Sequence, residues 1–195
     1  MQIMNGAVNR QKGFTLIESI IGIIILGFAL LILVTGVFSS ASKSHQATYQ
    51  SQAATLGHSI MTDILSRQFD EHSDPNGGAY RCGEVSAPDA CSSPNELGRD
   101  SSEENGSPTF NDVDDFIGCW GEAAQCTSGL ASYPLNRLID SSSADEYKNF
   151  TVEINVAYAD VDNRVTVITQ FKKIDITLYA SNHAQYTFSA YRGNY

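Results

Sequence analysis

Residues 13–38 constrain this chain more than any other segment. They are predominantly apolar and carry a single charged side chain, Glu18, close to their start. At 1.5 Å per residue, about 25 helical residues span the roughly 30 Å hydrocarbon core of a bilayer. A lone carboxylate just inside a membrane helix is energetically costly, so it is a functional-site hypothesis by default. We therefore expect a membrane-spanning helix in which Glu18 has a specific task.

The segment before this helix is short and basic. Residues 1–13 contain Arg10 and Lys12 and no acidic residue. Basic flanks tend to remain in the cytoplasm, which places the chain after Phe38 on the opposite side of the membrane. A cleaved signal peptide would have a shorter apolar region, of about 7–15 residues. A plain signal anchor fits the length better, but neither interpretation explains Glu18.

The segment from Gly13 to Glu18 reads Gly-Phe-Thr-Leu-Ile-Glu and opens an unbroken apolar run. This pattern, after a short basic leader, resembles the processing signal of type IV prepilins and type II secretion pseudopilins. In that family a membrane-bound prepilin peptidase cuts after the glycine and methylates the new terminal amine. The resemblance implies cleavage between Gly13 and Phe14 and N-methylation of Phe14. It also implies that the Glu18 carboxylate pairs with the terminal amine of a neighbouring subunit, a partner that makes a buried charge tolerable.

The same resemblance divides the chain into three parts. It implies a leader peptide at residues 1–13, a transmembrane and assembly helix at residues 14–38, and a pilin head at residues 39–195. The protein would lie in the inner membrane with its head in the periplasm and would later reach a pilus at the cell surface. Its partners would be the prepilin peptidase and other pilin subunits, which it contacts through the amino-terminal helix.

All four cysteines follow the apolar segment, which suggests two disulfides formed in an oxidising compartment. Four cysteines allow three pairings. We favour Cys82–Cys91 and Cys119–Cys126, because each pair closes a short loop and short loops are easier to close. Neither spacing is typical of a zinc site, whose paired cysteines lie about two to four residues apart. We expect no metal and no other cofactor.

Apolar residues at helical spacing continue beyond the membrane segment. Ala53, Leu56, Ile60 and Ile64 form a stripe, which predicts one helix that reaches about Arg67 and lays this stripe on the head. Turn-forming residues at 74–78 then end the helical part of the chain.

The carboxyl-terminal part of the chain predicts a sheet. Apolar and polar residues alternate in three stretches, and short connections favour antiparallel strands with one face buried against the helix. Before them, residues 80–138 hold all four cysteines and predict an irregular, disulfide-tied excursion that Phe116 and Trp120 pack onto the head. Together these features predict an α+β fold of the type IV pilin kind. The expected strands are residues 150–158, 174–179 and 186–191, with a short strand or lead-in at 165–168 and turns at 160–164 and 181–183.

An acidic stretch at residues 110–116 contains three carboxylates, Asp112, Asp114 and Asp115. Calcium prefers six to eight oxygen ligands, so these side chains are weak candidates for a calcium site. Their spacing differs from that of an EF-hand loop. The two simpler interpretations are a solvated acidic loop and side chains that cap the local backbone.

Composition and the absence of certain motifs argue against two classes of function, nucleic-acid binding and catalysis. A formal net charge of −10 argues against nucleic acid as a partner. The sequence has no phosphate-binding loop, nucleophile elbow or dinucleotide fingerprint, so we do not expect an enzyme. The loop around Cys82, the acidic stretch and residues 188–192 resemble minor pilins of the mannose-sensitive haemagglutinin (MSHA) type, which implies a low-abundance subunit that initiates or caps a pilus in a Gram-negative bacterium.

Two alternatives stay open at this point. A pseudopilin of a type II secretion system would share every residue discussed above. A membrane-anchored, exported binding domain that never polymerises would differ, because Phe14 would then never become a free, methylated terminus. In that case Leu would replace Glu18 without consequence.

Overall fold

The computed structural model describes residues 13–74, 80–103, 105–159, 168–181 and 184–195, with the backbone alone for residues 38–45. The chain forms two compact units, Met1–Ala47 and Thr48–Tyr195. Several expected features lie outside the described residues: the leader up to residue 12, most of the turn at 74–78, the turn at 160–164, nearly all of the short strand at 165–168, and residues 182–183 of the last turn.

Helix α1 (Leu16–Ser66) confirms the expected long helix. Its sequence is rich in leucine, isoleucine and alanine and contains no proline, which favours an uninterrupted helix. The helix ends at Ser66, which confirms the expected end near Arg67. There Arg67 closes a tighter turn onto Ile64, and the backbone N–H of Gln68 donates to the carbonyl of Asn111. Directly after the helix, the backbone therefore hydrogen-bonds to the excursion.

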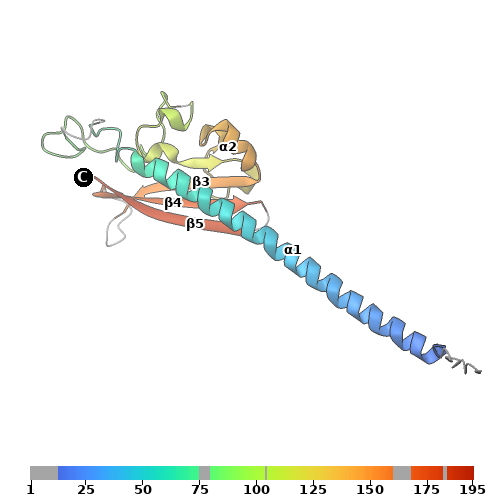
Figure 1. Ribbon diagram of the computed structural model, residues 1–195. Coiled ribbons are helices and arrows are strands. Elements are labelled where there is room, and N and C mark those ends of the chain that lie inside the picture. The colour runs from blue at the N-terminus through green and yellow to red at the C-terminus, as the bar shows by residue number, and fades with distance from the viewer. Residues whose placement is uncertain (1–12, 75–79, 104, 160–167, 182–183) are drawn as a thin grey trace, which may run out of the picture. The chain divides into compact units, whose positions relative to one another are not determined.

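Among the described residues, five strands form one sheet in the order β2-β1-β3-β4-β5. Figure 1 shows β3, β4 and β5 side by side. The three expected strands are confirmed as an antiparallel meander, in which Ile154 lies opposite Ile176 and Ile176 opposite Phe188. The excursion adds β1, antiparallel to β3, and β2, parallel to β1. The strands are β1 (Gly118–Trp120), β2 (Ser132–Tyr133), β3 (Phe150–Tyr158), β4 (Phe171–Ala180) and β5 (Ala184–Gly193).

Residues 48–66 of α1 cover one face of this sheet (Figure 1). The predicted stripe is buried, with each of its four side chains at most 3% exposed, and it packs on inward-facing residues of β3 and β4. Helix and sheet are in close contact at Gly57. A Cβ atom placed there would lie 2.5 Å from the ring of Phe188 in β5. Glycine at this position therefore allows the helix to lie directly on the strand.

Replacing Gly57 by Leu is expected to destabilise the head by about 1–3 kcal/mol, because added side-chain atoms overpack a filled interface. Urea unfolding of the detergent-solubilised protein measures this, with the single tryptophan, buried Trp120, as the fluorescent probe. Ala54→Leu is the matched control, since Ala54 is exposed on the same helix, and its effect should stay within about 0.5 kcal/mol. Equal stability of the two variants would contradict the close packing.

One expectation about β3 is wrong. It was expected to be half-buried, but Thr151 and Glu153 on its outer face are also buried, at 1% and 7% exposure. The reason is the excursion, which crosses this face. Glu153 accepts hydrogen bonds from the backbone N–H of Ser128 (2.9 Å) and the hydroxyl of Thr127 (3.2 Å). Thr151 and Glu153 therefore anchor the loop, whereas Asn155 on the same face is exposed.

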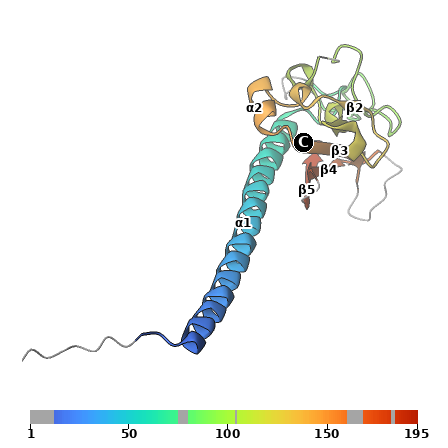
Figure 2. The same cartoon turned by 90° about the vertical axis from the view of Figure 1, so that its right-hand side faces the viewer.

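The excursion is irregular, as expected, and its aromatic residues join the main core. Phe116 and Trp120 are fully buried, and the indole N–H of Trp120 donates to the carbonyl of Phe116 (3.0 Å). A short helix, α2 (Ser141–Glu146), follows the excursion and was not anticipated; it lies close to the carboxyl-terminal part of α1 (Figure 2). The remaining short elements are the 3-10 helices η1 (Ser107–Thr109), η2 (Asp114–Phe116), η3 (Ala123–Gln125) and η4 (Leu135–Arg137).

Candidate processing and assembly site

The expected cleavage site lies just outside α1. Gly13 and Phe14 have no regular secondary structure and are exposed, and the Phe14 side chain is 82% exposed. Exposed backbone outside helices and sheets is the preferred substrate of proteases. The bond between Gly13 and Phe14 is therefore accessible, and its cleavage would leave only Phe14 and Thr15 ahead of the helix.

Thr15 begins the helix by capping it. Its hydroxyl oxygen accepts the backbone N–H of Glu18 (3.3 Å), and its carbonyl accepts the N–H of Ser19 (3.2 Å). The spacing of Thr15 and Glu18 is that of a capping box. Glu18 also lies in the first helical turn, where the helix dipole stabilises a negative charge. The cap thus fixes Glu18 in the first turn of the helix, four residues after the expected new terminus at Phe14.

The first part of α1, Leu16–Val37, is predominantly apolar. Leu16–Val37 has a mean hydropathy of 3.0, and all its side chains are exposed on the isolated chain. At 1.5 Å per residue, these 22 residues span about 33 Å, enough to cross a bilayer. So large an apolar surface requires lipid or other apolar helices around it. Length and composition therefore suit both a membrane anchor and a helix that packs with neighbours.

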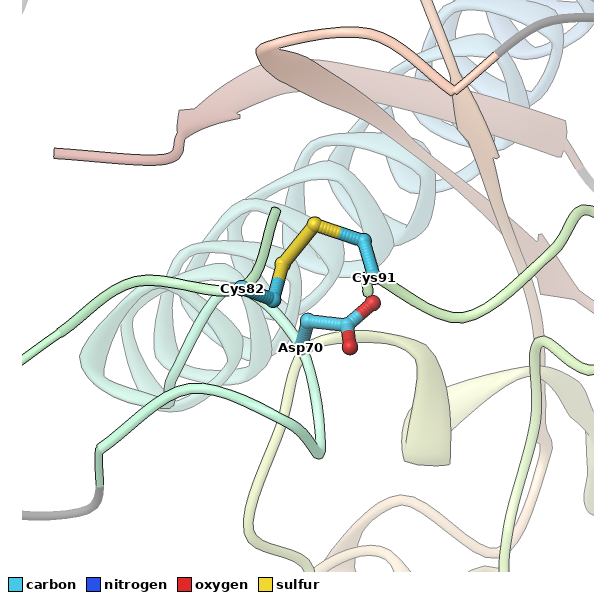
Figure 3. Close-up of side chains that lie close together, drawn as sticks. All are labelled: Asp70, Cys82 and Cys91. Carbon is cyan, nitrogen blue, oxygen red and sulfur yellow. A yellow bond between two sulfur atoms is a disulfide. The ribbon is translucent and has the colours of Figure 1, made fainter. Parts of the chain in front are cut away.

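Both disulfides are present in the structure, and they join Cys82 to Cys91 and Cys119 to Cys126. This is the pairing favoured from loop length. Figure 3 shows the first disulfide beside the carboxylate of Asp70, where the three side chains lie close enough together to suggest metal ligands. Because both sulfurs belong to a disulfide, neither is a thiolate, and only Asp70 remains as a ligand. This cluster is therefore not a metal centre.

The three carboxylates considered for calcium are buried, each at most 3% exposed. Asp112 accepts the backbone N–H groups of Asp114 (2.8 Å) and Asp115 (3.3 Å). Asp115 accepts those of Asn111 (2.8 Å) and Asp112 (3.0 Å). The interpretation as a solvated acidic loop is wrong, whereas the capping of local backbone by Asp112 and Asp115 is confirmed. Calcium binding by these residues stays a prediction, and the hydrogen bonds occupy oxygens that a cation would need.

Lys172 in β4 is a buried charge that was not predicted from the sequence. Its side chain is fully buried, and its Nζ donates to Oδ2 of Asp70 (3.0 Å) and to Oδ1 of Asp114. The rings of Phe69 and Tyr158 lie 4.8 and 5.3 Å from Nζ. These contacts join the segment after α1, the acidic stretch and the sheet at one point.

The electrostatics of this cluster follow from burial and from its excess of carboxylates. Burial opposes the charge on Lys172, but Asp114, Asp112 and Asp70 outweigh it and raise the Lys172 pKa. Burial likewise opposes the charge on Asp70, but Lys172 and backbone hydrogen bonds outweigh it, so the Asp70 pKa is lowered. Burial, followed by the charge on Asp114, raises the pKa of Asp112 to about 9. Burial is the main cause that raises the pKa of Asp115 to about 7, and a hydrogen bond with the carboxyl group of Glu103 is the second.

The head is expected to lose stability as the pH rises from about 5 to about 9. The pKa values of Asp112 and Asp115 are higher in the folded head than in the unfolded chain, so the folded head binds more protons than the unfolded chain in this range. The contribution of Asp115 is lost as the pH passes about 7 and that of Asp112 as it passes about 9. Urea unfolding at several pH values, followed by Trp120 fluorescence, measures the trend. Asp112→Asn should flatten it, and a stability that rises over this range would contradict the assignment.

Comparison with known proteins identifies a family motif in the amino-terminal segment. Residues 8–34 match the family model of the prokaryotic N-terminal methylation motif, which includes Gly13, Phe14 and Glu18 and most of the apolar part of α1. This motif supports a type IV pilin-like or pseudopilin protein. It implies a membrane-anchored substrate of a prepilin peptidase that assembles with other pilin subunits. No curated protein and no solved structure matches the chain.

Proposed function

We propose that the protein is a minor type IV pilin of the MSHA type, with a likeness to the D protein of MSHA pilus biogenesis. The prepilin peptidase removes residues 1–13 and methylates Phe14, and the subunit then enters a pilus through α1. The observation that carries this proposal is the N-terminal methylation motif, which runs directly into a helix whose other end packs on a disulfide-bonded α+β head.

The membrane arrangement follows from charge and from the cysteines. Arg10 and Lys12 favour a cytoplasmic amino terminus, which directs the head to the periplasm. Disulfides form and persist in that compartment, and all four cysteines of the chain are paired in the structure. The inner membrane is therefore the proposed location before assembly, and the pilus at the cell surface is the location afterwards.

Assembly itself depends on Glu18 in this proposal. The exposed apolar surface of α1 would pack against the helices of other subunits in a medium of low dielectric constant. There the Glu18 carboxylate would neutralise the terminal amine of Phe14 from a neighbouring subunit. The role we propose is structural rather than catalytic, because the residues singled out above serve processing, pairing and packing. The likeness to minor pilins of the MSHA type extends this proposal to the initiation or capping of the pilus.

The second candidate function, a pseudopilin of a type II secretion system, is favoured by the same methylation motif. Deleting the gene separates the two. For a minor pilin, deletion should reduce the number of surface pili seen by electron microscopy, and a plasmid copy should restore them. For a pseudopilin, the cargo of the type II system should instead stay inside the cell while pilus number is unchanged. That second result would overturn the minor-pilin proposal.

A further inference from the structure

The role proposed above leaves the buried amine of Lys172 without a function. Its Nζ contacts carboxylate oxygens of both Asp70 and Asp114, and all three side chains are at most 3% exposed. We propose that Lys172 condenses with Asp114 to form an intramolecular amide bond, with Asp70 as the carboxylate that carries protons during the reaction. This modification would be independent of processing and assembly at the amino terminus.

The hydrogen bonds of the two carboxylates identify Asp114 as the one that reacts. Oδ1 of Asp114 faces Nζ, while Oδ2 accepts the backbone N–H of Gly98 (3.0 Å) and would keep it as the carbonyl oxygen of an amide. Oδ2 of Asp70 contacts Nζ but also accepts the hydroxyl of Tyr158 (3.2 Å) and the N–H of Ser92 (3.1 Å). Loss of that oxygen would break both contacts. Asp70 is thus held as an anion in contact with Nζ, where it can take a proton from the nitrogen once the attack has made that nitrogen positively charged.

The surroundings of Lys172 favour condensation over hydrolysis. An amine and a carboxyl group held in a reactive orientation can reach effective concentrations of about 10⁵ M or more. The site is enclosed by the rings of Phe69 and Tyr158, which limits the access of water. Asp112 lies beside Asp114 and is neutral at neutral pH because burial raises its pKa to about 9. A neutral Asp112 adds no further negative charge beside the carboxyl group that is attacked.

The step balances without an oxidant or a cofactor. The reaction begins when a proton moves from the Lys172 ammonium to Asp114, which gives a neutral amine and a carboxylic acid. This transfer is energetically uphill, because the nearby carboxylates raise the Lys172 pKa. The nitrogen lone pair then attacks Cγ of Asp114, and Asp70 accepts a second proton from nitrogen. The bond between Cγ and Oδ1 breaks, and this oxygen leaves as water after receiving the proton from Asp70. The product is one amide bond that joins η2 to β4.

The test is the mass of the protein purified from its native membrane with both disulfides reduced. The expected result is an intact mass below the calculated value by one water molecule. Tryptic digestion should yield a branched peptide that joins the sequence around Lys172 to that around Asp114, with no cleavage after Lys172. In the same digest, half-exposed Lys173 should be unmodified. The variant Lys172→Arg should have the full calculated mass, because a guanidinium group does not condense with a carboxylate.

Three results would overturn the proposal. The first is wild-type protein at its full calculated mass, with Lys172 recovered in a linear peptide; this measurement needs no variant and holds even if Lys172→Arg fails to fold. The second is a water deficit without a branched peptide, since succinimide formation at an aspartate also removes water. The third is a branch to Asp70, which would contradict the assignment of Asp114 as the reacting carboxyl group.

Discussion

Replacing Glu18 by Leu is expected to abolish incorporation of the protein into filaments while leaving removal of the leader intact. In a neighbouring subunit the terminal amine of Phe14 would then be buried among apolar helices without a counter-charge. Stranding one partner of a buried ion pair costs about 3–5 kcal/mol. At about 1.4 kcal/mol per factor of ten, each subunit contact would weaken roughly a hundredfold or more. The measurement is the fraction of the protein that is recovered in sheared filaments rather than in membranes.

The matched control for this experiment is Ser19→Leu, which introduces the same side chain at the adjacent position. Ser19 contributes a side-chain hydrogen bond to the carbonyl of Thr15, within its own helix. This variant should enter filaments like the wild type. If Glu18→Leu also enters filaments normally, the carboxylate has no role in assembly, and an anchored domain that never polymerises becomes the better account.

Replacing Lys172 by Met is expected to cause the largest loss of stability in the head. The methionine side chain is similar in length, but it leaves the carboxylates of Asp70 and Asp114 buried beside each other without a cation. Whether wild-type Lys172 is a free ammonium or is condensed with Asp114, the variant leaves buried negative charge uncompensated, which costs about 3–5 kcal/mol. Because a whole domain is stable by only about 5–15 kcal/mol, this variant should unfold at much lower urea concentration. Trp120 fluorescence of the purified protein measures the shift.

The neighbouring residue offers a close control. Lys173 also lies in β4 and pairs with Asp175 at 2.9 Å, but both side chains are more than one-third exposed. Water screens such a pair, so Lys173→Met should cost less than about 1 kcal/mol. Similar unfolding of the two variants would mean that the buried cluster contributes no more than a surface ion pair.

The elements that could be predicted from the sequence are those with a local signal. A 3.6-residue period identified the buried stripe of α1, and a two-residue period identified the cores of β3, β4 and β5. Short loops between cysteines favoured the pairing that the structure contains. The processing motif is a continuous segment, from Gly13 to Glu18, and so it could be found in the sequence without knowledge of the fold.

The features that were missed depend on contacts between distant segments. Glu153 looked like an outward-facing strand residue, and its burial depends on how the excursion crosses β3. For Asp112 and Asp114, a solvated loop and local capping were both open, and no sequence pattern indicated that these side chains are buried. Lys172 did carry a signal: it precedes Ile174 by two residues and therefore shares the inward face of β4. A lysine on a buried face needs a carboxylate partner, but the period of a strand cannot identify that partner.

The central claim, that this chain is processed as a prepilin, is tested most directly by mass spectrometry of its amino terminus. The protein should be purified from its native membrane and the amino-terminal peptide fragmented. The account predicts a chain that begins at Phe14 and carries one methyl group on its terminal amine. An intact Met1, or a terminus created after Ala41 by a signal peptidase, would contradict it.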